Sequence, residues 1–210
     1  MSEIVDLVNK FDKFQKKHPG GDVAGFCRYF LAKQADKHKG DKSFGPMPPT
    51  PESQLAKIMG RLLSVFSVYH EAALAKTRMP FREGFYMVNW LKHHGEMKKT
   101  EFINELLIGY TTGMDAINKL IKEGLINERN HDTDKRAKLI SVSPYGEEVL
   151  LECYPLMQKV TRMTFHGMHP EAIQFCINLL TEPEIRRTRN VAELKGLDFD
   201  EMYERVMSEE

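Results

Sequence analysis

The stretch from Leu106 to Leu150, LLIGYTTGMDAINKLIKEGLINERNHDTDKRAKLISVSPYGEEVL, carries the strongest local structural signals in this chain of 210 residues. Apolar residues recur every three or four positions in its first third, which predicts a helix from about Thr112 to Glu123. Gly124 follows at the position where a helix commonly ends in the left-handed region. The stretch therefore begins with a helix whose C-terminal end is marked by a glycine.

A hairpin and a second helix follow that glycine. Residues 125–129 and 137–143 have the composition and alternation of strands, and the run 130–136 between them is polar and turn-prone. Ser143 and Pro144 then favour the N-cap and the first position of another helix. Helix, hairpin and helix in this order is the layout of a winged helix. Such a fold can place a helix in the major groove of DNA and its hairpin against the neighbouring backbone or minor groove.

Four segments resemble sequence features of the MarR family of bacterial transcription regulators. Lys99 to Leu106 is similar to the first helix of the family's helix-turn-helix, and Gly124-Leu125-Ile126 follows the segment that is similar to its recognition helix. Asp134-Lys135-Arg136 resembles the Asp-x-Arg of the family's wing, and Val142-Ser143-Pro144-Tyr145-Gly146 is similar to its Leu-Thr-x-x-Gly. The resemblance covers roughly residues 54 to 180.

The resemblance implies both a fold and a function. The fold is mainly α: a winged helix-turn-helix with a small β-hairpin wing and long flanking dimerisation helices. The function is that of a sequence-specific, double-stranded DNA-binding transcription regulator, a homodimer that reads a near-palindromic operator. The family also implies that a small aromatic or amphipathic effector modulates DNA binding. No cofactor and no enzymatic activity are expected, because the chain shows no phosphate-cradling glycine loop, nucleophile elbow or paired-carboxylate frame.

The sequence divides into three predicted regions. Residues 1–51 are expected to form an N-terminal helical extension and a Pro-rich linker, with a helix break at Pro19-Gly20-Gly21 and a helix cap at Asp22. Residues 52–181 are expected to form the MarR-like winged-helix domain with its dimerisation helices. Residues 182–210, in which acidic residues outnumber basic ones, are expected to be an acidic C-terminal extension.

Apolar stripes predict further helices on both sides of the winged helix. One is expected over 52–76, one from Met79-Pro80 to about Gly95, and a long one from Pro144 to about Gly167 that Pro155 should kink or split. A short apolar helix is expected over 172–180. The long stripes exceed what the small central unit covers, which favours pairing with a second copy of the chain. Packing onto the N-terminal extension is the alternative.

Polar and cationic residues at the two expected DNA contacts are candidate binding residues. Hydroxyl groups at a helix N-terminus contact phosphates, asparagine can pair with adenine, and arginine suits a narrow minor groove or a phosphate. On the recognition helix the candidates are Thr111, Thr112, Asp115, Asn118 and Lys119. In the wing they are Asp134, Lys135, Arg136 and Lys138, and the resemblance implies that Asp134 holds Arg136 in place. A helix cap at Asp115 and an ordinary charged hairpin tip are the alternative interpretations.

Aromatic residues near the long helices are candidates for an effector pocket. They are Phe66, Tyr69, Phe85, Tyr86 and Trp90. The same residues would serve equally well as hydrophobic core.

Cysteine and histidine patterns give little sign of further chemistry. Cys27, Cys153 and Cys176 are too few and too scattered for a disulfide framework, and they are expected to be buried, inert thiols. The pairs His93-His94 and His166-x-x-His169 lack acidic or thiol partners at useful spacing, so no metal site is expected.

The composition, with 41% hydrophobic and 29% charged residues, is that of a soluble globular protein. The few, scattered cysteines favour a reducing cytoplasm as its location. No apolar run approaches a membrane span, and the balance of 30 basic and 30 acidic residues does not itself indicate a nucleic-acid binder. Two functional alternatives stay open: a winged-helix protein-interaction module without DNA binding, and a cysteine-based redox-sensing regulator.

Overall fold

The computed structural model describes residues 2–35, 50–134 and 136–208. The chain divides into two compact units, Met1–Leu55 and Ala56–Glu210. The boundary lies inside helix α3 (Pro51–Leu74), close to the division that the sequence suggests after residue 51. Most of the proposed linker over 37–51 falls outside the described residues.

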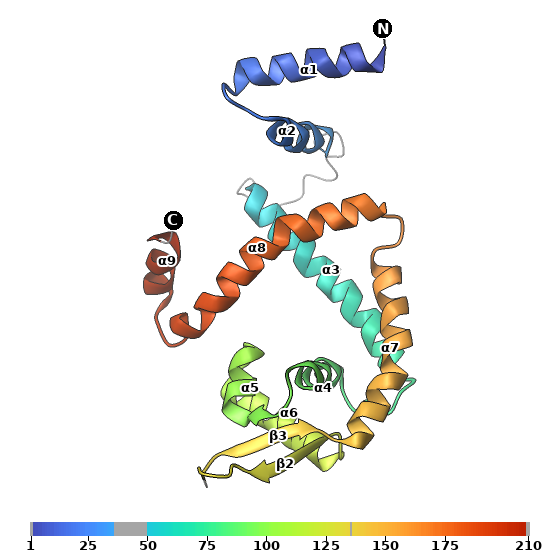
Figure 1. Ribbon diagram of the computed structural model, residues 1–210, viewed down its shortest axis with the longest axis vertical. Helices are drawn as coiled ribbons and strands as arrows, with labels where there is room; N and C mark the ends of the chain where they lie inside the picture. Colours follow the sequence, from blue (N-terminus) through green and yellow to red (C-terminus); the bar gives the residue numbers. More distant parts are fainter. Residues whose placement is uncertain (1, 36–49, 135, 209–210) are drawn as a thin grey trace, which may run out of the picture. The chain divides into compact units, whose positions relative to one another are not determined.

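The first unit contains a pair of helices, α1 (Glu3–Lys17) and α2 (Val23–Ala35), drawn in blue in Figure 1. The Asp22 carboxylate accepts a 2.7 Å hydrogen bond from the backbone N–H of Gly25 at the start of α2. Gly20, in the turn between the helices, has a φ of 83°, which favours glycine. The helix break and the cap that the sequence predicts are therefore confirmed.

The second unit has a mainly helical fold with a small antiparallel sheet, as the sequence predicts. After α3, its elements are α4 (Arg82–His94), β1 (Met97–Lys98), α5 (Lys99–Glu105), α6 (Tyr110–Lys122), β2 (Ile126–Asn130), β3 (Lys138–Val142), α7 (Pro144–Thr164), α8 (Pro170–Leu194) and α9 (Phe199–Ser208). Figure 1 shows α4, α5, α6 and the strands gathered in one lobe, from which α3 and α7 extend. We call this group, residues 82–142, the winged-helix lobe.

The sheet has three strands in the order β1-β3-β2. The hairpin of β2 and β3 pairs Ile126 with Val142 and Asn130 with Lys138, which confirms the predicted wing. Strand β1 was not predicted from the sequence. It places Met97 opposite Ile140 on the other edge of β3, so the wing is attached to the segment that precedes α5.

A single buried core holds the winged-helix lobe to α7. Its fully buried side chains come from α4, α5, α6, the sheet and α7, and the largest of them include Leu91, Phe102, Ile103, Ile117, Leu120, Leu125, Ile140 and Leu150. Burial of this much apolar surface is the main stabilising contribution to the lobe. It also fixes which faces of α6 and of the hairpin remain exposed.

The junction between the sheet and α7 is fixed by Ser143. Its hydroxyl accepts a hydrogen bond of 2.9 Å from the N–H of Gly146 and donates one of 2.5 Å to the carbonyl oxygen of Gly124. A Cβ on Gly146 would lie 2.1 Å from the carbonyl oxygen of Leu125, so the backbones meet too closely for any side chain. Gly124 has a φ of 76°, as its position after α6 predicts.

Two helices are longer or more continuous than the sequence suggests. Helix α7 continues through Pro155 without splitting, and α8 continues to Leu194 instead of ending near residue 180. Ion pairs one turn apart, such as Arg186 with Glu182 at 2.9 Å, support the second half of α8. The expected start of the C-terminal extension at 182 therefore lies inside a helix. None of the described helices is long and apolar enough to cross a membrane.

Candidate nucleic-acid interface

The N-terminal end of α6 is open to a ligand. Its N-cap is Gly109, which offers no side-chain hydrogen bond, and the first turn contains no acidic residue. Backbone N–H groups at a helix N-terminus that lack such a cap carry partial positive charge and favour an anion such as phosphate. Thr111 and Thr112 are both exposed in this first turn. The structure therefore presents hydroxyl and amide donors together at one end of α6.

One face of α6 carries the predicted contact residues. Thr111, Asp115 and Asn118 recur at helical spacing and are exposed, and Lys122 continues the same row. Asp115 lies beyond the first turn and makes no capping hydrogen bond, so the structure does not show the alternative role of a cap. The sequence also suggests Lys122 as a phosphate contact, and its spacing from Asn118 places it on this face.

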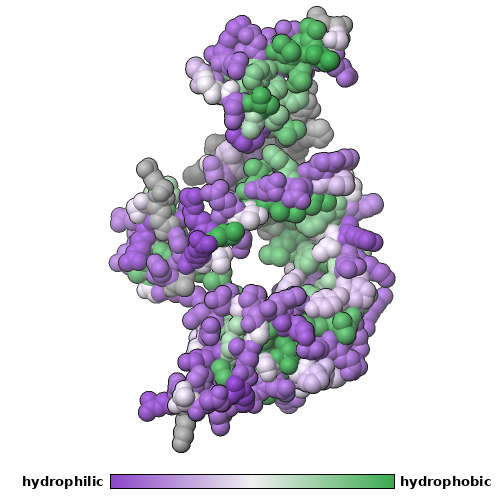
Figure 2. Space-filling model, viewed as in Figure 1, coloured by the Kyte–Doolittle hydropathy of each residue, from purple (hydrophilic) through white to green (hydrophobic). Residues whose placement is uncertain are grey.

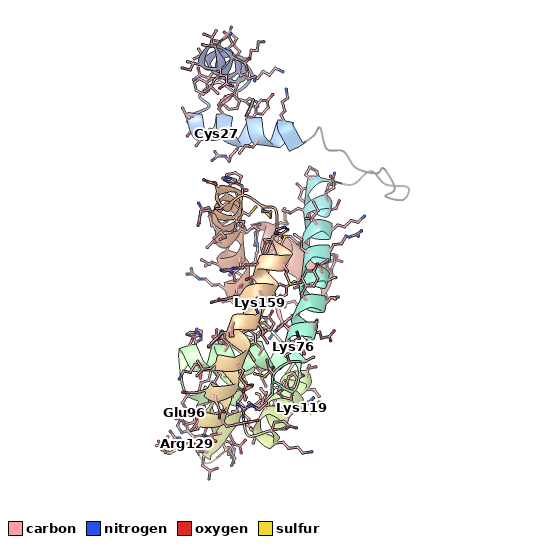
Figure 3. All side chains as sticks on the ribbon, turned by 90° about the vertical axis from the view of Figure 1, so that its right-hand side faces the viewer. Cys27, Lys76, Glu96, Lys119, Arg129 and Lys159 are labelled. Carbon is pink, nitrogen blue, oxygen red and sulfur yellow. The ribbon has the colours of Figure 1, made fainter. Side chains whose placement is uncertain are left out.

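Lys119 lies at the edge of that face. Its ammonium group is 4.6 Å from the centroid of the Phe81 ring, in front of α4. This cation–π contact holds the side chain toward the body of the lobe. Figure 3 labels Lys119 on the lower part of the molecule.

A lysine at the start of α5 connects the wing to the recognition helix. The ammonium group of Lys99 forms an ion pair with Glu128 of β2 and donates a 3.4 Å hydrogen bond to the side-chain oxygen of Asn118 on α6. The Lys99 hydrogen bond and charge lower the pKa of the Glu128 carboxyl group. The Lys99 side chain is only 12% exposed, which strengthens its charge interaction relative to a surface pair.

The base of the wing is held by Arg129. Its guanidinium group forms a two-pronged contact with the Glu96 carboxylate, at 2.8 and 2.5 Å, and a further 2.8 Å pair with Asp132. Figure 3 shows Glu96 and Arg129 beside each other at the lower end of the lobe. The contact lowers the pKa of Glu96 and raises that of Arg129. The guanidinium group of Arg129 is thus engaged by Glu96 and Asp132, which leaves it few donors for a DNA phosphate.

The tip of the wing presents Arg136. The Asp134 carboxylate accepts a 3.1 Å hydrogen bond from the backbone N–H of Arg136, so it orders the backbone and not the guanidinium group. The Arg136 side chain is exposed and forms no ion pair with any described residue. Lys138, by contrast, donates to Asn130 at 2.6 Å and lies 3.6 Å from Glu128. Lys135 lies outside the described residues.

Comparison with known proteins relates this geometry to a family of structures. Residues 86–146 match the family described as a winged helix DNA-binding domain, whereas no curated protein matches the sequence significantly. The apo form of MarR from E. coli superposes with a TM-score of 0.54 at 13% identity, over 61% of this chain and 95% of that chain. The MarR family regulator Sco3205 from Streptomyces coelicolor, solved in complex with DNA, superposes with a TM-score of 0.56 at 18% identity, over 65% and 91%. BpsR from Bordetella bronchiseptica gives a TM-score of 0.51 at 22% identity, over 60% and 98%.

The chain has the MarR fold. The domain matched by residues 86–146 runs from α4 to the first turn of α7 and includes α6 and the wing. The family model that matches these residues is described as a winged helix DNA-binding domain. Within the MarR fold of this chain, the exposed face of α6 and Arg136 of the wing both lie inside the matched residues.

The aromatic residues proposed as a pocket separate into two groups in this MarR fold. The rings of Phe66, Phe85 and Tyr86 lie 5.6, 5.6 and 5.0 Å from the ring of His70, measured between centroids. Tyr69 and Trp90 are both half-buried against the core of the second unit, and the Trp90 ring stacks on His94 with centroids 3.7 Å apart. The structure thus brings three of the five residues together around His70.

His70 at the centre of this group is fully buried. Neither ring nitrogen has a hydrogen-bond partner among the described residues. Burial lowers the pKa of His70, and the positive charge of Arg82 lowers it further, against the opposing effect of Glu83 and Glu71. An unpaired buried imidazole is costly, which makes it a candidate for contact with a polar ligand atom. We call His70 with Phe66, Phe85 and Tyr86 the His70 cluster.

The thiols differ from the prediction that all three are buried. Cys153 is buried, and burial raises its pKa, so its thiolate form is disfavoured. Cys27 and Cys176 are exposed, because α2 and α8 leave these positions uncovered in the single chain. Within the described ranges there is no cluster of histidine, cysteine or acidic residues that could hold a metal ion.

Proposed function

We propose that the protein is a sequence-specific, double-stranded DNA-binding transcription regulator of MarR type. The observation that carries the proposal is the exposed polar face of α6, with its uncapped N-terminus, on the same lobe as the exposed Arg136 of the wing. A helix of this kind fits the major groove, and an exposed arginine suits a phosphate or the minor groove. The structural similarity to Sco3205 in complex with DNA, and to a MarR mutant complexed with operator DNA, supports it. A cytoplasmic location is part of this proposal, because the protein would act where the DNA is.

The proposal includes a homodimer that binds a near-palindromic operator. A stripe of exposed apolar residues runs along α3, made of Leu55, Ile58, Met59, Leu62 and Leu63. Another group is exposed on α8, made of Phe175, Ile177, Leu179, Leu180 and Ile185. Apolar patches of this extent favour contact with a second subunit, and a two-fold dimer presents two α6 helices to two half-sites.

The proposal also includes control by a small effector at the His70 cluster. Aromatic rings and one buried, unpaired imidazole favour a small aromatic or amphipathic compound with a polar group. The cluster joins α3 to α4, so a ligand there would shift the winged-helix lobe relative to the dimerisation helices. BpsR, whose DNA binding is described as regulated by 6-hydroxynicotinic acid, supports this part by analogy.

The function is tested by DNA binding at several salt concentrations. Full-length protein is titrated against duplexes from the region upstream of its own gene and against scrambled duplexes, with a footprint to locate the site. We expect preference for one site and an affinity that falls steeply with salt, by about 0.9 log units per phosphate contact for each tenfold rise in salt. No DNA retention even at low salt contradicts the proposal and favours a protein-interaction module.

The wing provides a matched pair of variants for the same titration. Arg136→Ala should weaken binding by about 1–3 kcal/mol if the free guanidinium group contacts DNA. Lys138→Ala removes the same charge but from a residue already paired with Glu128, so its effect should be clearly smaller. Equal effects of the two variants, or none from either, would refute this role of the wing.

The homodimer is tested by sedimentation of the native chain and two α3 variants. Ile58→Lys places a charge on the exposed stripe and should produce a folded monomer. Ser64→Lys alters an exposed position of the same helix outside the stripe and should leave the dimer intact. A monodisperse native monomer at micromolar concentration contradicts the dimer and removes the basis for a palindromic site.

A further inference from the structure

The N-terminal helix pair contains a cleft that the winged helix does not use. Its volume is about 520 Å³, within the range of small-molecule sites, and the described residues that line it belong to α1 and α2. Figure 2 shows hydrophobic residues exposed beside hydrophilic ones on this unit.

One wall of the cleft is a stripe of α1. Lys10, Lys13, Phe14 and Lys17 line it, at the spacing that places residues on a single helix face. Phe14 is buried and forms the apolar part of this wall. A Cβ on Gly21 would lie 2.6 Å from its ring, so the ring packs directly on the backbone of the turn. The floor at Phe14 is thus held in place.

The opposite wall is a stripe of α2 with the same spacing. Phe26, Tyr29, Phe30 and Lys33 line it. Phe26 is buried against Phe14, with ring centroids 5.6 Å apart, whereas Tyr29 and Phe30 are half-buried. Lys10 lies over the Phe30 ring at 5.1 Å, and Lys33 lies over the Tyr29 ring at 5.3 Å. The two walls together give an aromatic floor with cationic side chains at its rim.

The charge at this rim is of one sign. Among residues 2–35, no acidic residue lines the cleft. Lys10 and Lys16 are paired along the helix with Asp6 and Asp12, at 2.5 and 2.7 Å. Lys13, Lys17 and Lys33 have no acidic partner within residues 2–35. Three ammonium groups therefore remain to attract an anion above an apolar floor.

We propose that this cleft binds a small anionic amphiphile, an aromatic or short acyl body that carries a carboxylate. The aromatic floor buries the apolar body, and the lysine ammonium groups hold the anionic group at the rim. A duplex would use the lysines but leave the rings unused, because its bases are stacked inside it. The site is separate from the His70 cluster and does not rest on the proposed DNA function.

The test uses calorimetric titration of the full-length protein with a naphthalene carboxylate. Lys13→Gln with Lys17→Gln should weaken binding about tenfold, because two charge-assisted contacts are lost. The matched control is Lys76→Gln with Lys159→Gln, which changes the net charge by the same amount. Lys76 lies between α3 and α4, Lys159 lies on α7, and both are exposed. The control should leave the affinity unchanged. Ring resonances of labelled tyrosine, assigned with Tyr29→Phe, should shift on binding.

Competing ligands decide between occupants. The neutral naphthalene methanol should bind at least about tenfold more weakly than the carboxylate, because it lacks the charge. Equal binding of the neutral compound, or equal loss in the control variant, overturns the proposal. An acidic helical peptide and a DNA duplex are titrated in the same way as competing occupants. The proposal is also overturned if Lys13→Gln with Lys17→Gln weakens the binding of either of these but leaves the binding of the carboxylate unchanged.

Discussion

Ile103 occupies the space in which a side chain at Gly113 would lie. A Cβ built on Gly113 would be 2.7 Å from Cγ1 of Ile103 and 3.1 Å from both of its methyl carbons. Gly113 is in the first half of α6 and Ile103 is in α5, and both are buried. The close crossing of these two helices, and with it the projection of the recognition helix, therefore depends on a glycine at this position.

Gly113→Ala should lower the free energy of unfolding by about 1–3 kcal/mol, because the new methyl group overpacks the crossing. Denaturant unfolding measures the effect. Ile103→Ala alone should also destabilise the protein, through a cavity. In the double variant the alanine methyl at 113 partly fills that cavity, so the combined loss should be smaller than the sum of the two. Strict additivity would contradict the packing described.

Ser143→Ala should destabilise the second unit by about 1–2 kcal/mol, because it removes the cap of α7. The loss should lie at the upper end of that range, since the side chain is only 4% exposed and the carbonyl oxygen of Gly124 also loses its donor. Ser64→Ala is the control, because that hydroxyl is exposed and bonds only to the preceding turn of α3. A similar effect of both substitutions on thermal unfolding would show that the Ser143 junction contributes nothing special.

Asn118→Ala and Lys122→Ala should differ in how they affect DNA binding. Loss of the amide should relax base preference at one position of each half-site, by about 1–3 kcal/mol, with little change in salt dependence. Loss of the lysine should weaken binding to operator and scrambled duplexes alike and flatten the salt slope by about one unit. Titration of both variants at several salt concentrations measures this. Identical behaviour would mean that another face of α6 enters the groove.

His70 should make stability depend on pH below neutrality. Its pKa is lowered in the folded state, so the unfolded chain binds the proton more readily. Stability is full above the unfolded pKa of about 6.5 and falls as the pH drops from there to the folded pKa. His70→Leu should flatten this dependence of stability on pH. At pH 8 the substitution should cost only the free energy of repacking the side chain, because neither ring nitrogen of His70 loses a hydrogen bond.

The control for this experiment is His166→Gln, because His166 is exposed. Urea unfolding of the three proteins from pH 8 to pH 5 gives the comparison. The native and His166→Gln proteins should lose stability in parallel, while His70→Leu should not follow them. Parallel curves for all three would assign the pH dependence to other groups.

Local signals in the sequence predict much of this fold. The cap at Ser143, the left-handed Gly124 and the break before Asp22 each depend on a few neighbouring residues, and all are confirmed. The exposed face of α6 follows from helical spacing in the same way. Strand β1 was missed, because its two residues show no periodicity and gain their partner from a distant strand. Leu107 between α5 and α6 has a φ of 55°, which no rule for leucine predicts.

The candidate site shows the same division between local and long-range effects. That Lys119 and Lys138 are exposed is local information. Lys119 lies over Phe81 and Lys138 lies beside Glu128, and both contacts join separate elements. Sequence spacing therefore did not distinguish these two paired lysines from Arg136, which forms no ion pair with any described residue. The cleft between α1 and α2 has the same origin, since its two stripes are visible in sequence but their apposition is not.

Lys99 has a consequence for how the protein meets a duplex. One ammonium group contacts both Glu128 of the wing strand and Asn118 of the recognition helix. The position of the wing relative to the recognition helix is therefore fixed in the free protein, before it binds DNA. The entropy of ordering these two elements is then lost during folding and not on binding, which favours association in a single kinetic step. A signal that leaves this Lys99 contact intact would act by changing the separation of the two reading surfaces. Both contacts of a half-site should then be gained and lost together.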